Sequence, residues 1–279
     1  NAGHNVYHAL NALLAKKSKV IVCLGGNIAA AAPDTEQTLT ALCNSELNVQ
    51  ISTKLNRSHL AIGKDALILP CLGRTEIDQQ ASGPQFITVE DTFSMVHASQ
   101  GNVPPMSSEQ KSEVAIIAGI ASATLGNNLV NWPDLTNNYH LIREMISQTL
   151  PEFSNFNQRV NQPRGFYLGN SAANLQWKNN EKKALFSANN LPEKLVAQLF
   201  QSQQKSPLFT LQTLRSHDQY NTTVYGMNDR YRGINNERNV LFINKKDAKK
   251  LSLKENDHVK ITSIWSDNRE RSLSGFKIK

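Results

Sequence analysis

Hydrophobic and polar positions in the first half of the chain follow two periods in turn. Short apolar runs at residues 20–24, 47–53 and 66–70 predict strands, while the helical spacing of apolar positions at 5–17 and 34–44 predicts helices. Strands and helices that alternate at this spacing are typical of βαβ units, so we expect a parallel sheet. The first run, from Val20 to Leu24, has no polar position, which predicts a strand buried on both faces.

The pattern changes along the rest of the chain. Polar residues at 73–84 predict a loop, 86–90 a fourth short strand, and 91–106 an irregular segment. Two further helices are expected at 107–125, capped by Ser107 or Ser108, and at 139–150. Short strands with little helix between them predict a small β-barrel; they are expected at 208–214, 240–243, 258–264 and 273–278.

These elements predict an α/β protein, with a Rossmann-like parallel sheet domain followed by part of a small β-barrel. We expect an α/β domain at residues 1–150, a crossover segment at 151–204 that is rich in turn residues, and a partial β-barrel at 205–279.

The first predicted strand ends in the turn Gly25-Gly26-Asn27. Asp34 and Gln37 then fit a capping box at the start of the next helix. A strand that ends in glycines and leads to a helix is where open α/β sheets bind nucleotides, because the backbone there can approach a phosphate closely. The same pattern also fits a plain strand–turn–helix.

Polar loops follow each of the first three predicted strands, and in a parallel sheet all three lie along one carboxyl edge. Their backbone amides, amide side chains, arginines and carboxylates have the chemistry to hold a phosphate, a ribose hydroxyl and a purine. Ordinary surface loops are the alternative. The candidate binding residues in these loops are Gly25, Gly26, Asn27, Thr53, Asn56, Arg57, Arg74, Glu76 and Asp78.

A second concentration of polar and aromatic residues lies at 213–233. Such a density is costly if it is buried without partners, and a polar ligand would supply them. A solvated hairpin loop is the alternative. The candidate binding residues here are Arg215, Ser216, His217, Gln219, Asn221 and Thr222.

Charge and cysteine content narrow the class of protein. The formal net charge of +7 lies entirely in residues 201–279, which hold 15 Lys and Arg against 8 Asp and Glu. This excess suits an anionic cofactor or a lysine-rich surface; without interleaved aromatics or a recognised motif we expect no nucleic-acid partner. No apolar run is long enough to span a bilayer. The three cysteines lack metal-site spacing and predict buried, reduced thiols in a cytoplasmic protein.

The sequence resembles the C-terminal part of the molybdopterin-guanine-dinucleotide oxidoreductases of the dimethyl-sulfoxide-reductase superfamily, in the branch of formate-dehydrogenase-like alpha subunits. The stretches that carry the resemblance are LGGNIAAAAPD, TKLNRSHL, ILPCLGRTEIDQQ, TVEDTFSMVHASQG and RSHDQYNTTVYGMNDRYRG. In that family the first stretches belong to an α/β domain that holds one of two pterin dinucleotides, and the last belongs to a double-psi-type barrel. Family members are longer, so the resemblance implies a fragment.

The resemblance also implies a function. It predicts a molybdenum centre that moves two electrons to or from a small substrate. The electron-transfer partner cannot be identified from the sequence. The resemblance also implies that a metal ligand and a 4Fe-4S cluster lie in an upstream half. We expect residues 25–27 at the pyrophosphate, Thr53, Asn56 and Arg57 towards the guanosine, and Arg215 to Asn221 at the pterin. No residue here is assigned as a catalytic group or metal ligand, so the fragment alone is expected to be inactive. A non-catalytic binding or regulatory protein on the same scaffold is the alternative.

Overall fold

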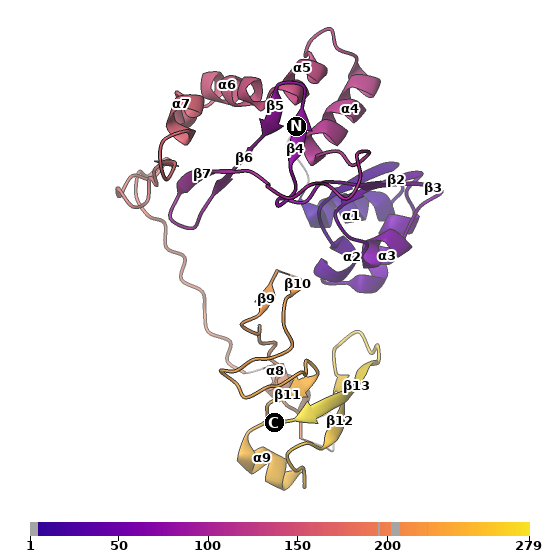
Figure 1. Cartoon of the computed structure of the whole chain (residues 1–279). Helices are drawn as coiled ribbons and strands as arrows, with labels where there is room; N and C mark the ends of the chain where they lie inside the picture. The colour runs from indigo at the N-terminus through magenta and orange to yellow at the C-terminus, as the bar shows by residue number, and fades with distance from the viewer. Residues whose placement is uncertain (1–4, 195, 202–206, 222) are drawn as a thin grey trace. The chain divides into compact units, whose positions relative to one another are not determined.

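The structure is a computed structural model that describes residues 5–194, 196–201, 207–221 and 223–279 (Figure 1). It divides into two compact units, Asn1–Leu185 and Phe186–Lys279. Each unit has its own strands and helices, and each is described separately below.

The first unit is built on a three-stranded parallel sheet in the order β1-β2-β3, as the alternating pattern predicts. Its register places Val22 opposite Val49 and Val49 opposite Leu67, so the carboxyl ends of all three strands meet at one edge. Figure 1 shows these strands beside the short helices of the N-terminal region. The elements are α1 (Val6–Leu14), β1 (Val20–Leu24), α2 (Ile28–Ala31), α3 (Thr35–Cys43), β2 (Leu47–Ser52), η1 (Arg57–Leu60) and β3 (Asp65–Pro70).

Local capping explains where the first helices begin. Asn5 caps α1 by accepting a hydrogen bond from the backbone N–H of His8 at 2.9 Å. Asp34 caps α3, as predicted, by accepting from the Gln37 backbone N–H at 3.0 Å. The Gln37 side chain donates to the Asp34 carboxylate, rather than accepting from the Asp34 backbone N–H as in a full capping box, so the box is only partly formed.

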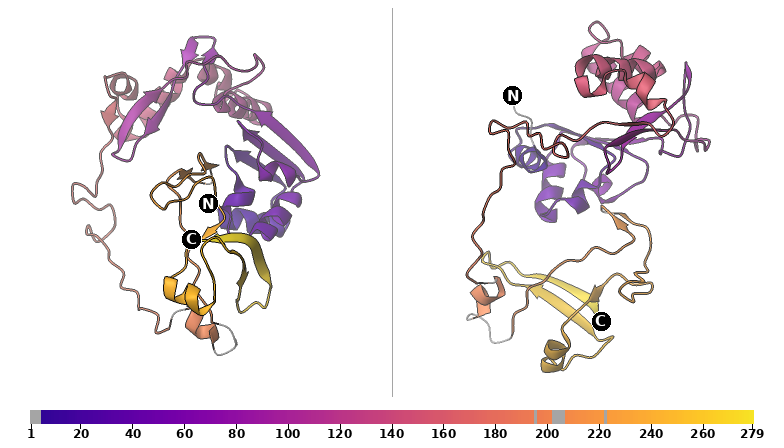
Figure 2. Two further views of the ribbon diagram at one scale, coloured as in Figure 1. Left: turned by 60° about the horizontal axis from the view of Figure 1, so that its bottom comes forward. Right: turned by 90° about the vertical axis from the view of Figure 1, so that its left-hand side faces the viewer.

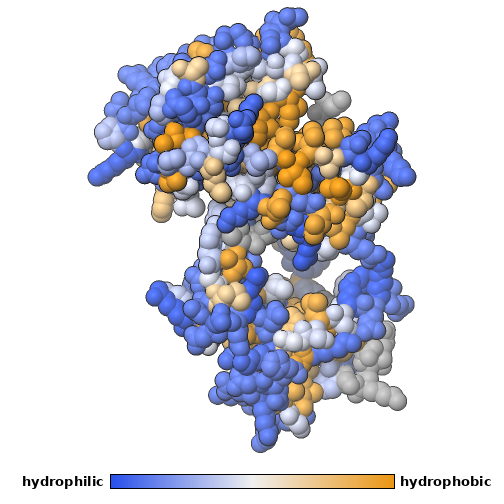
Figure 3. Space-filling view, turned by 45° about the vertical axis from the view of Figure 1, so that its right-hand side comes forward, coloured by the Kyte–Doolittle hydropathy of each residue, from blue (hydrophilic) through white to orange (hydrophobic). Residues whose placement is uncertain are grey.

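The sheet is buried unevenly, and the expectation that β1 is buried on both faces is wrong. The middle strand β2 is almost fully buried, whereas Val20, Val22 and Leu24 of β1 are each about half exposed. β1 lies at an edge of the sheet, and its side chains alternate between the two faces. Val20, Val22 and Leu24 share the more exposed face, whereas Ile21 lies on the opposite face and packs against the core of α2 and α3. The space-filling view in Figure 3 shows apolar residues, in orange, exposed together on the surface of the molecule.

Two small antiparallel sheets follow the parallel one, where the polar pattern predicts mainly a loop and an irregular segment. The segments expected at 73–84 and 91–106 contain the strands β4, β5 and β7, and β6 pairs with β7 instead of joining the parallel sheet. Strands of three residues are too short to show a period in the sequence. Their bounds are β4 (Asp78–Gln80), β5 (Gly83–Gln85), β6 (Ile87–Glu90), β7 (Met95–Ser99) and β8 (Phe166–Tyr167).

The helices of the first unit pack on these sheets. The expected helix at 107–125 begins only at Glu113, because Ser112, not Ser107 or Ser108, caps it by accepting from the Ala115 N–H at 3.2 Å. A separate core of Val96, Phe156, Val160 and Phe166 joins β7, β8 and α7. The elements are α4 (Glu113–Leu125), α5 (Trp132–Asn137), α6 (Tyr139–Thr149), η2 (Pro151–Phe153) and α7 (Phe156–Val160).

The second unit has less regular structure. Its largest sheet has the order β11-β13-β12, and β9 pairs only with β10, so the strands in the described part of this unit do not close a barrel. No strand forms at 208–214, where the alternation predicts one. Figure 2 shows the two long strands β12 and β13 together. The elements are α8 (Val196–Phe200), β9 (Gln219–Tyr220), β10 (Thr223–Val224), β11 (Val240–Leu241), α9 (Lys245–Lys250), β12 (His258–Ser263) and β13 (Arg271–Ile278).

The cysteines correct another expectation. All three are free, as predicted, but only Cys71 is buried; Cys23 is half-buried and Cys43 is exposed. Cys43 is the last residue of α3, on a helix whose buried side carries Thr38, Ala41 and Leu42. Apolar neighbours in the sequence therefore do not predict whether a cysteine lies on the buried or the exposed side of a helix.

Candidate cofactor-binding site

The turn after β1 has a backbone that only glycine adopts easily. Gly25 has a φ of +67°, and its N–H donates to the carbonyl of Ile51 at 2.8 Å, which ties the turn to the end of β2. At Gly26 an added Cβ would meet no atom within 4 Å. The chain itself thus leaves open space at Gly26, and an exposed peptide there can approach a ligand closely.

The second loop is joined to this turn by side chains. The Asn56 amide donates to the Gly26 carbonyl at 3.1 Å, and the buried Ser58 hydroxyl accepts from the Ala29 N–H at 3.1 Å and donates to the Asn27 side chain at 3.4 Å. The loops after β1 and β2 therefore form one connected structure, which places Gly25, Gly26, Asn27 and Asn56 together as the sequence predicts.

The same loop is shaped by a short 3-10 helix. Asn56 accepts from the Ser58 N–H, and the ring Nδ1 of His59 accepts from the Asn56 N–H at 3.0 Å. The other ring nitrogen of His59, Nε2, is buried and has no hydrogen-bond partner. Thr53 precedes this helix and Arg57 is its first residue; both side chains are exposed, which leaves them available to a ligand at this edge.

The third loop is held in a different way. The Glu76 carboxylate accepts from the Gly73 N–H at 2.6 Å and from the Met106 N–H at 3.4 Å. The Arg74 guanidinium donates to the Ser99 hydroxyl at 3.0 Å. Both side chains are thus engaged in fixing the loop onto residues 99–106, and neither points freely into the edge of the sheet.

Asp78 lies apart from the other predicted residues. It is the first residue of β4, and its carboxylate accepts from the Tyr139 hydroxyl and from the Gln80 amide. The Tyr139 hydroxyl also contacts Ser112 at 2.7 Å. Burial, and then the hydrogen bond to Asp78, raises the pKa of Tyr139, so this phenol stays protonated. Asp78 thus belongs to a network between the β4–β5 hairpin, α4 and α6.

Sequence reasoning missed one carboxylate at the sheet edge, that of Glu113. Its Oε1 lies 3.4 Å from the position of a Cβ on Gly25. Burial first, and then the charges of Glu113 and Glu76, raise the pKa of the Cys71 thiol, which shows that both carboxylates lie near it. The missed signal is the cap at Ser112, because a helix that starts there brings Glu113 into its first turn.

The predicted residues of the second unit gather in a hairpin. The Ser216 carbonyl accepts from the Gln219 N–H at 3.3 Å, and the Gln219 side chain donates to the Asn221 carbonyl at 3.1 Å. Asn221 has a φ of +49°, which suits the turn between β9 and β10. Arg215 precedes the hairpin with an exposed side chain, and Thr222 lies outside the described residues.

Aromatic and basic side chains extend this hairpin site. The rings of His217 and Tyr231 lie 4.0 Å apart between centroids, and the Arg230 guanidinium donates to the Tyr231 hydroxyl at 3.0 Å. Asp229 is buried below and accepts from Arg232 at 2.6 Å. Burial raises the pKa of Asp229, but the hydrogen bond and charge of Arg232 outweigh it, and the net pKa is lowered. The sequence reasoning included this stretch but did not single out Arg230, Tyr231 or Arg232.

The described residues of the chain hold no group of three or more His, Cys, Asp or Glu side chains arranged to bind a metal ion. In the part of the chain that the structure describes, no helix is both long enough and apolar enough to cross a membrane.

The hairpin and its basic, aromatic surroundings are covered by a family match. Residues 209–269 match the molydopterin dinucleotide binding domain. This stretch contains Arg215, His217, Gln219 and Asn221, so the second unit is similar to a domain that binds a pterin dinucleotide.

Curated relatives match nearly the whole chain. "Protein YdeP" of Escherichia coli is 42% identical in strain CFT073 and 41% identical in strain K12, over 277 residues that make up 99% of this chain and 36% of each relative. "Uncharacterized oxidoreductase Rv2900c" of Mycobacterium tuberculosis H37Rv is 40% identical over 288 aligned positions, 99% of this chain and 35% of that protein. The chain thus spans about a third of the length of the curated relatives it matches.

Proposed function

We propose that this chain is the cofactor-binding C-terminal portion of a cytoplasmic molybdopterin oxidoreductase, and that each of its two units carries residues that bind molybdopterin guanine dinucleotide. The observation that carries the proposal is the match of residues 209–269 to a pterin-dinucleotide-binding domain, because that stretch contains the predicted hairpin. The oxidoreductase name of a relative that aligns with 99% of the chain supports the same class of protein.

The edge of the parallel sheet fits a dinucleotide. The backbone at Gly26 faces open space, so its peptide group can lie against a pyrophosphate without a clash. Asn56 holds that peptide in place by its bond to the Gly26 carbonyl. The exposed Arg57 guanidinium, on the residue directly before Ser58, has the fork geometry that suits phosphate oxygens.

Other groups at this edge suit hydroxyl and amine donors. Among the described residues we find no hydrogen-bond donor to the Glu113 carboxylate, which therefore remains available to a ribose hydroxyl or a guanine N–H. The buried His59 Nε2 has no partner either, since Nδ1 accepts from the backbone of Asn56. Glu76 and Arg74 are assigned to loop positioning, because their side chains bond to the protein.

The hairpin of the second unit supplies a different kind of contact. Arg215 offers five N–H donors and Gln219 offers an amide, in the same stretch as His217, whose ring packs against that of Tyr231. A pterin ring edge presents several acceptors and donors in one plane, which such groups satisfy together. We therefore assign this hairpin to the pterin end of a cofactor.

When bound, the cofactor would supply a molybdenum centre that exchanges two electrons with a small substrate and with a separate electron-transfer partner. For the substrate we propose formate or a similar small molecule. The protein's own contribution is to hold the dinucleotide in position and to set the charge around it. We propose that a metal ligand and a 4Fe-4S cluster belong to an upstream part of a full-length protein.

The experiment is a measurement of pterin and metal content in the full-length protein of which we propose this chain is a part. We expect about two pterin dinucleotides and one molybdenum per polypeptide after gel filtration, and reduction of an artificial acceptor with a small substrate. A purified protein that folds but contains neither pterin nor molybdenum would instead identify a non-catalytic protein on the same scaffold.

A further inference from the structure

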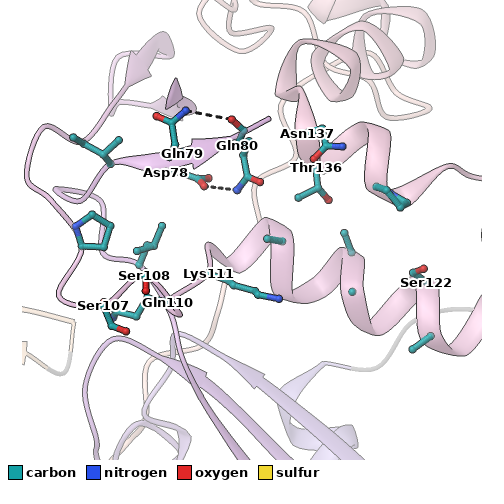
Figure 4. Close-up of a pocket in the computed structure, with 18 residues that line it drawn as sticks. Asp78, Gln79, Gln80, Ser107, Ser108, Gln110, Lys111, Ser122, Thr136 and Asn137 are labelled. Atoms are coloured by element: carbon teal, nitrogen blue, oxygen red, sulfur yellow. Dashed lines mark hydrogen bonds between the residues drawn. The ribbon is translucent and has the colours of Figure 1, made fainter. Parts of the chain in front are cut away.

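A separate pocket of about 800 Å³ lies in the first unit, between the β4–β5 hairpin, α4 and α5 (Figure 4). Its size is in the range of small-molecule sites. Neither the proposed cofactor site nor the match to residues 209–269 includes it. The polar residues that line it include Asp78, Gln80, Gln110, Lys111, Ser122 and Asn137.

The floor of the pocket is a strip of small side chains on α4. Ala115 lies one turn before Ala118 and Gly119, and among the described residues no atom lies within 4 Å of a Cβ added at Gly119. A flat apolar group can therefore lie directly on the helix backbone. Small residues alone do not identify a ligand, so the charges and hydrogen bonds of the walls decide its chemistry.

The lining residues of the pocket include one carboxylate, that of Asp78, and one ammonium group, that of Lys111. Among the described residues, the Asp78 carboxylate has hydrogen-bond partners and the Lys111 ammonium group does not. Both oxygens of Asp78 already accept hydrogen bonds, from the Tyr139 hydroxyl and the Gln80 amide. Within the described part of the chain, no ion pair or hydrogen bond involves the Lys111 amine, and Figure 4 shows this side chain directed into the pocket. The charge that remains to be matched by a ligand is thus positive.

Gln110, a further residue of the pocket wall, has one side-chain atom without a hydrogen-bond partner among the described residues. The side-chain oxygen Oε1 of Gln110 is buried and accepts no hydrogen bond, while its Nε2 donates to the Cys71 carbonyl at 3.5 Å. Buried acceptors are nearly always satisfied in folded proteins. A ligand with an O–H or N–H donor would satisfy this one if the Gln110 side chain, which lines the pocket, turned its oxygen toward it.

We propose that this pocket binds a small organic carboxylate that carries a flat apolar body and one hydrogen-bond donor. Its carboxylate pairs with Lys111, its apolar body lies on α4 over Gly119, and its donor faces the wall that carries Gln110. The proposal does not rest on the proposed function, since Lys111, Gly119 and Gln110 are not among the residues assigned to the cofactor.

The test uses 4-hydroxybenzoate, which has all three features, as a probe titrated into the purified chain and followed by protein NMR or calorimetry. For a ligand of about ten heavy atoms we expect a dissociation constant on the order of 1–10 mM. Neutral 4-hydroxybenzamide, which has the same shape, is expected to bind at least about tenfold more weakly because it cannot pair with Lys111.

Two variants locate the site. Lys111→Gln is expected to weaken 4-hydroxybenzoate at least about tenfold, while Lys17→Gln, on an exposed lysine outside the pocket, leaves binding unchanged. Gly119→Leu fills the open space above the helix and is expected to abolish binding without loss of fold, because leucine favours helix over glycine. Absence of binding at 20 mM probe, or equal affinity in the wild type and Lys111→Gln, would overturn the proposal.

Discussion

The two units carry their candidate binding residues in opposite ways. At the sheet edge of the first unit, the loops are tied to one another by side chains, with Asn56 bonded to Gly26 and Ser58 bonded to Ala29. In the hairpin of the second unit, Arg215 and His217 are exposed. Among the described residues, the two-residue strands of the hairpin pair with each other and with no further strand.

This difference bears on how each region would bind a ligand. A site whose loops are already bonded to each other loses little conformational entropy on binding, and it depends on backbone shape. A site made of long, exposed side chains loses more and depends on charge and donors. We therefore expect glycine substitutions to be most damaging in the first unit and charge substitutions to be most damaging in the second.

The largest expected effect tests how tightly the first unit fixes its loops. At Gly101 an added Cβ would lie 2.0 Å from the backbone oxygen of Glu76, so Gly101→Ala must displace the loop after β3. We expect a loss of about 3 kcal/mol or more in the free energy of unfolding, measured by urea denaturation of the first unit. Gly119→Ala, where nothing lies within 4 Å, should instead gain up to about 1 kcal/mol. Equal stabilities would contradict a tightly fixed loop.

The second prediction tests whether Gly26 is needed for the turn alone or for close approach of a ligand. Gly26→Val should leave the unfolding free energy of the chain nearly unchanged, because its Cβ meets no protein atom within 4 Å. In the full-length protein the same change should lower bound pterin about tenfold or more, since side-chain atoms would occupy the space of the pyrophosphate. The fluorescence of the released, oxidised pterin measures this, with Gly119→Val as the control. Full retention would mean that Gly26 serves the turn alone.

A smaller effect is expected at the contact that joins the first two loops. Ser58→Ala removes the buried acceptor of the Ala29 N–H and should destabilise the first unit by about 1–3 kcal/mol. Ser274→Ala, on an exposed position of β13, is the control and should change stability very little. If both variants unfold at the same denaturant concentration as the wild type, the loops are not held by this serine.

The fourth prediction concerns pH and the second unit. Arg232 holds the pKa of the buried Asp229 below its usual value near 3.8, so the folded state favours the carboxylate form more than the unfolded state does. The stabilisation is complete above the unfolded pKa and is lost as the pH falls below about 4 through the lower folded pKa. Thermal melts between pH 2.5 and 7 should show this loss, and Asp229→Asn should flatten it. A wild-type profile as flat as that of the variant would exclude this ion pair as the cause.

The sequence predicted the framework of the first unit well and its details less well. The three parallel strands have apolar cores long enough to show a period, and their polar loops do meet at one edge. The start of α4 was misplaced by six residues because Ser107, Ser108 and Ser112 are all acceptable caps, and only tertiary contacts select Ser112. Glu113 was missed for the same reason.

The contacts of the polar side chains could not be read from the sequence. Arg74, Glu76 and Asp78 stand within five residues, yet they bond to Ser99, to Gly73 and to Tyr139, respectively. Ser99 and Tyr139 lie far away in the sequence, so no local pattern encodes these two contacts. In the second unit, alternation at 208–214 did not produce a strand, since no neighbouring strand pairs with it.

The most direct test of the central claim compares Arg215→Ala with Lys249→Ala in the full-length protein, by pterin retained per mole of protein after equal dialysis. Arg215 belongs to the stretch that matches the pterin-dinucleotide domain and precedes the hairpin, whereas Lys249 is exposed on α9. We expect Arg215→Ala to weaken retention by about 1.5–3 kcal/mol, the size of a hydrogen bond to a charged group, and Lys249→Ala to change it very little. Equal retention in the two variants would contradict the assignment of this hairpin to the cofactor.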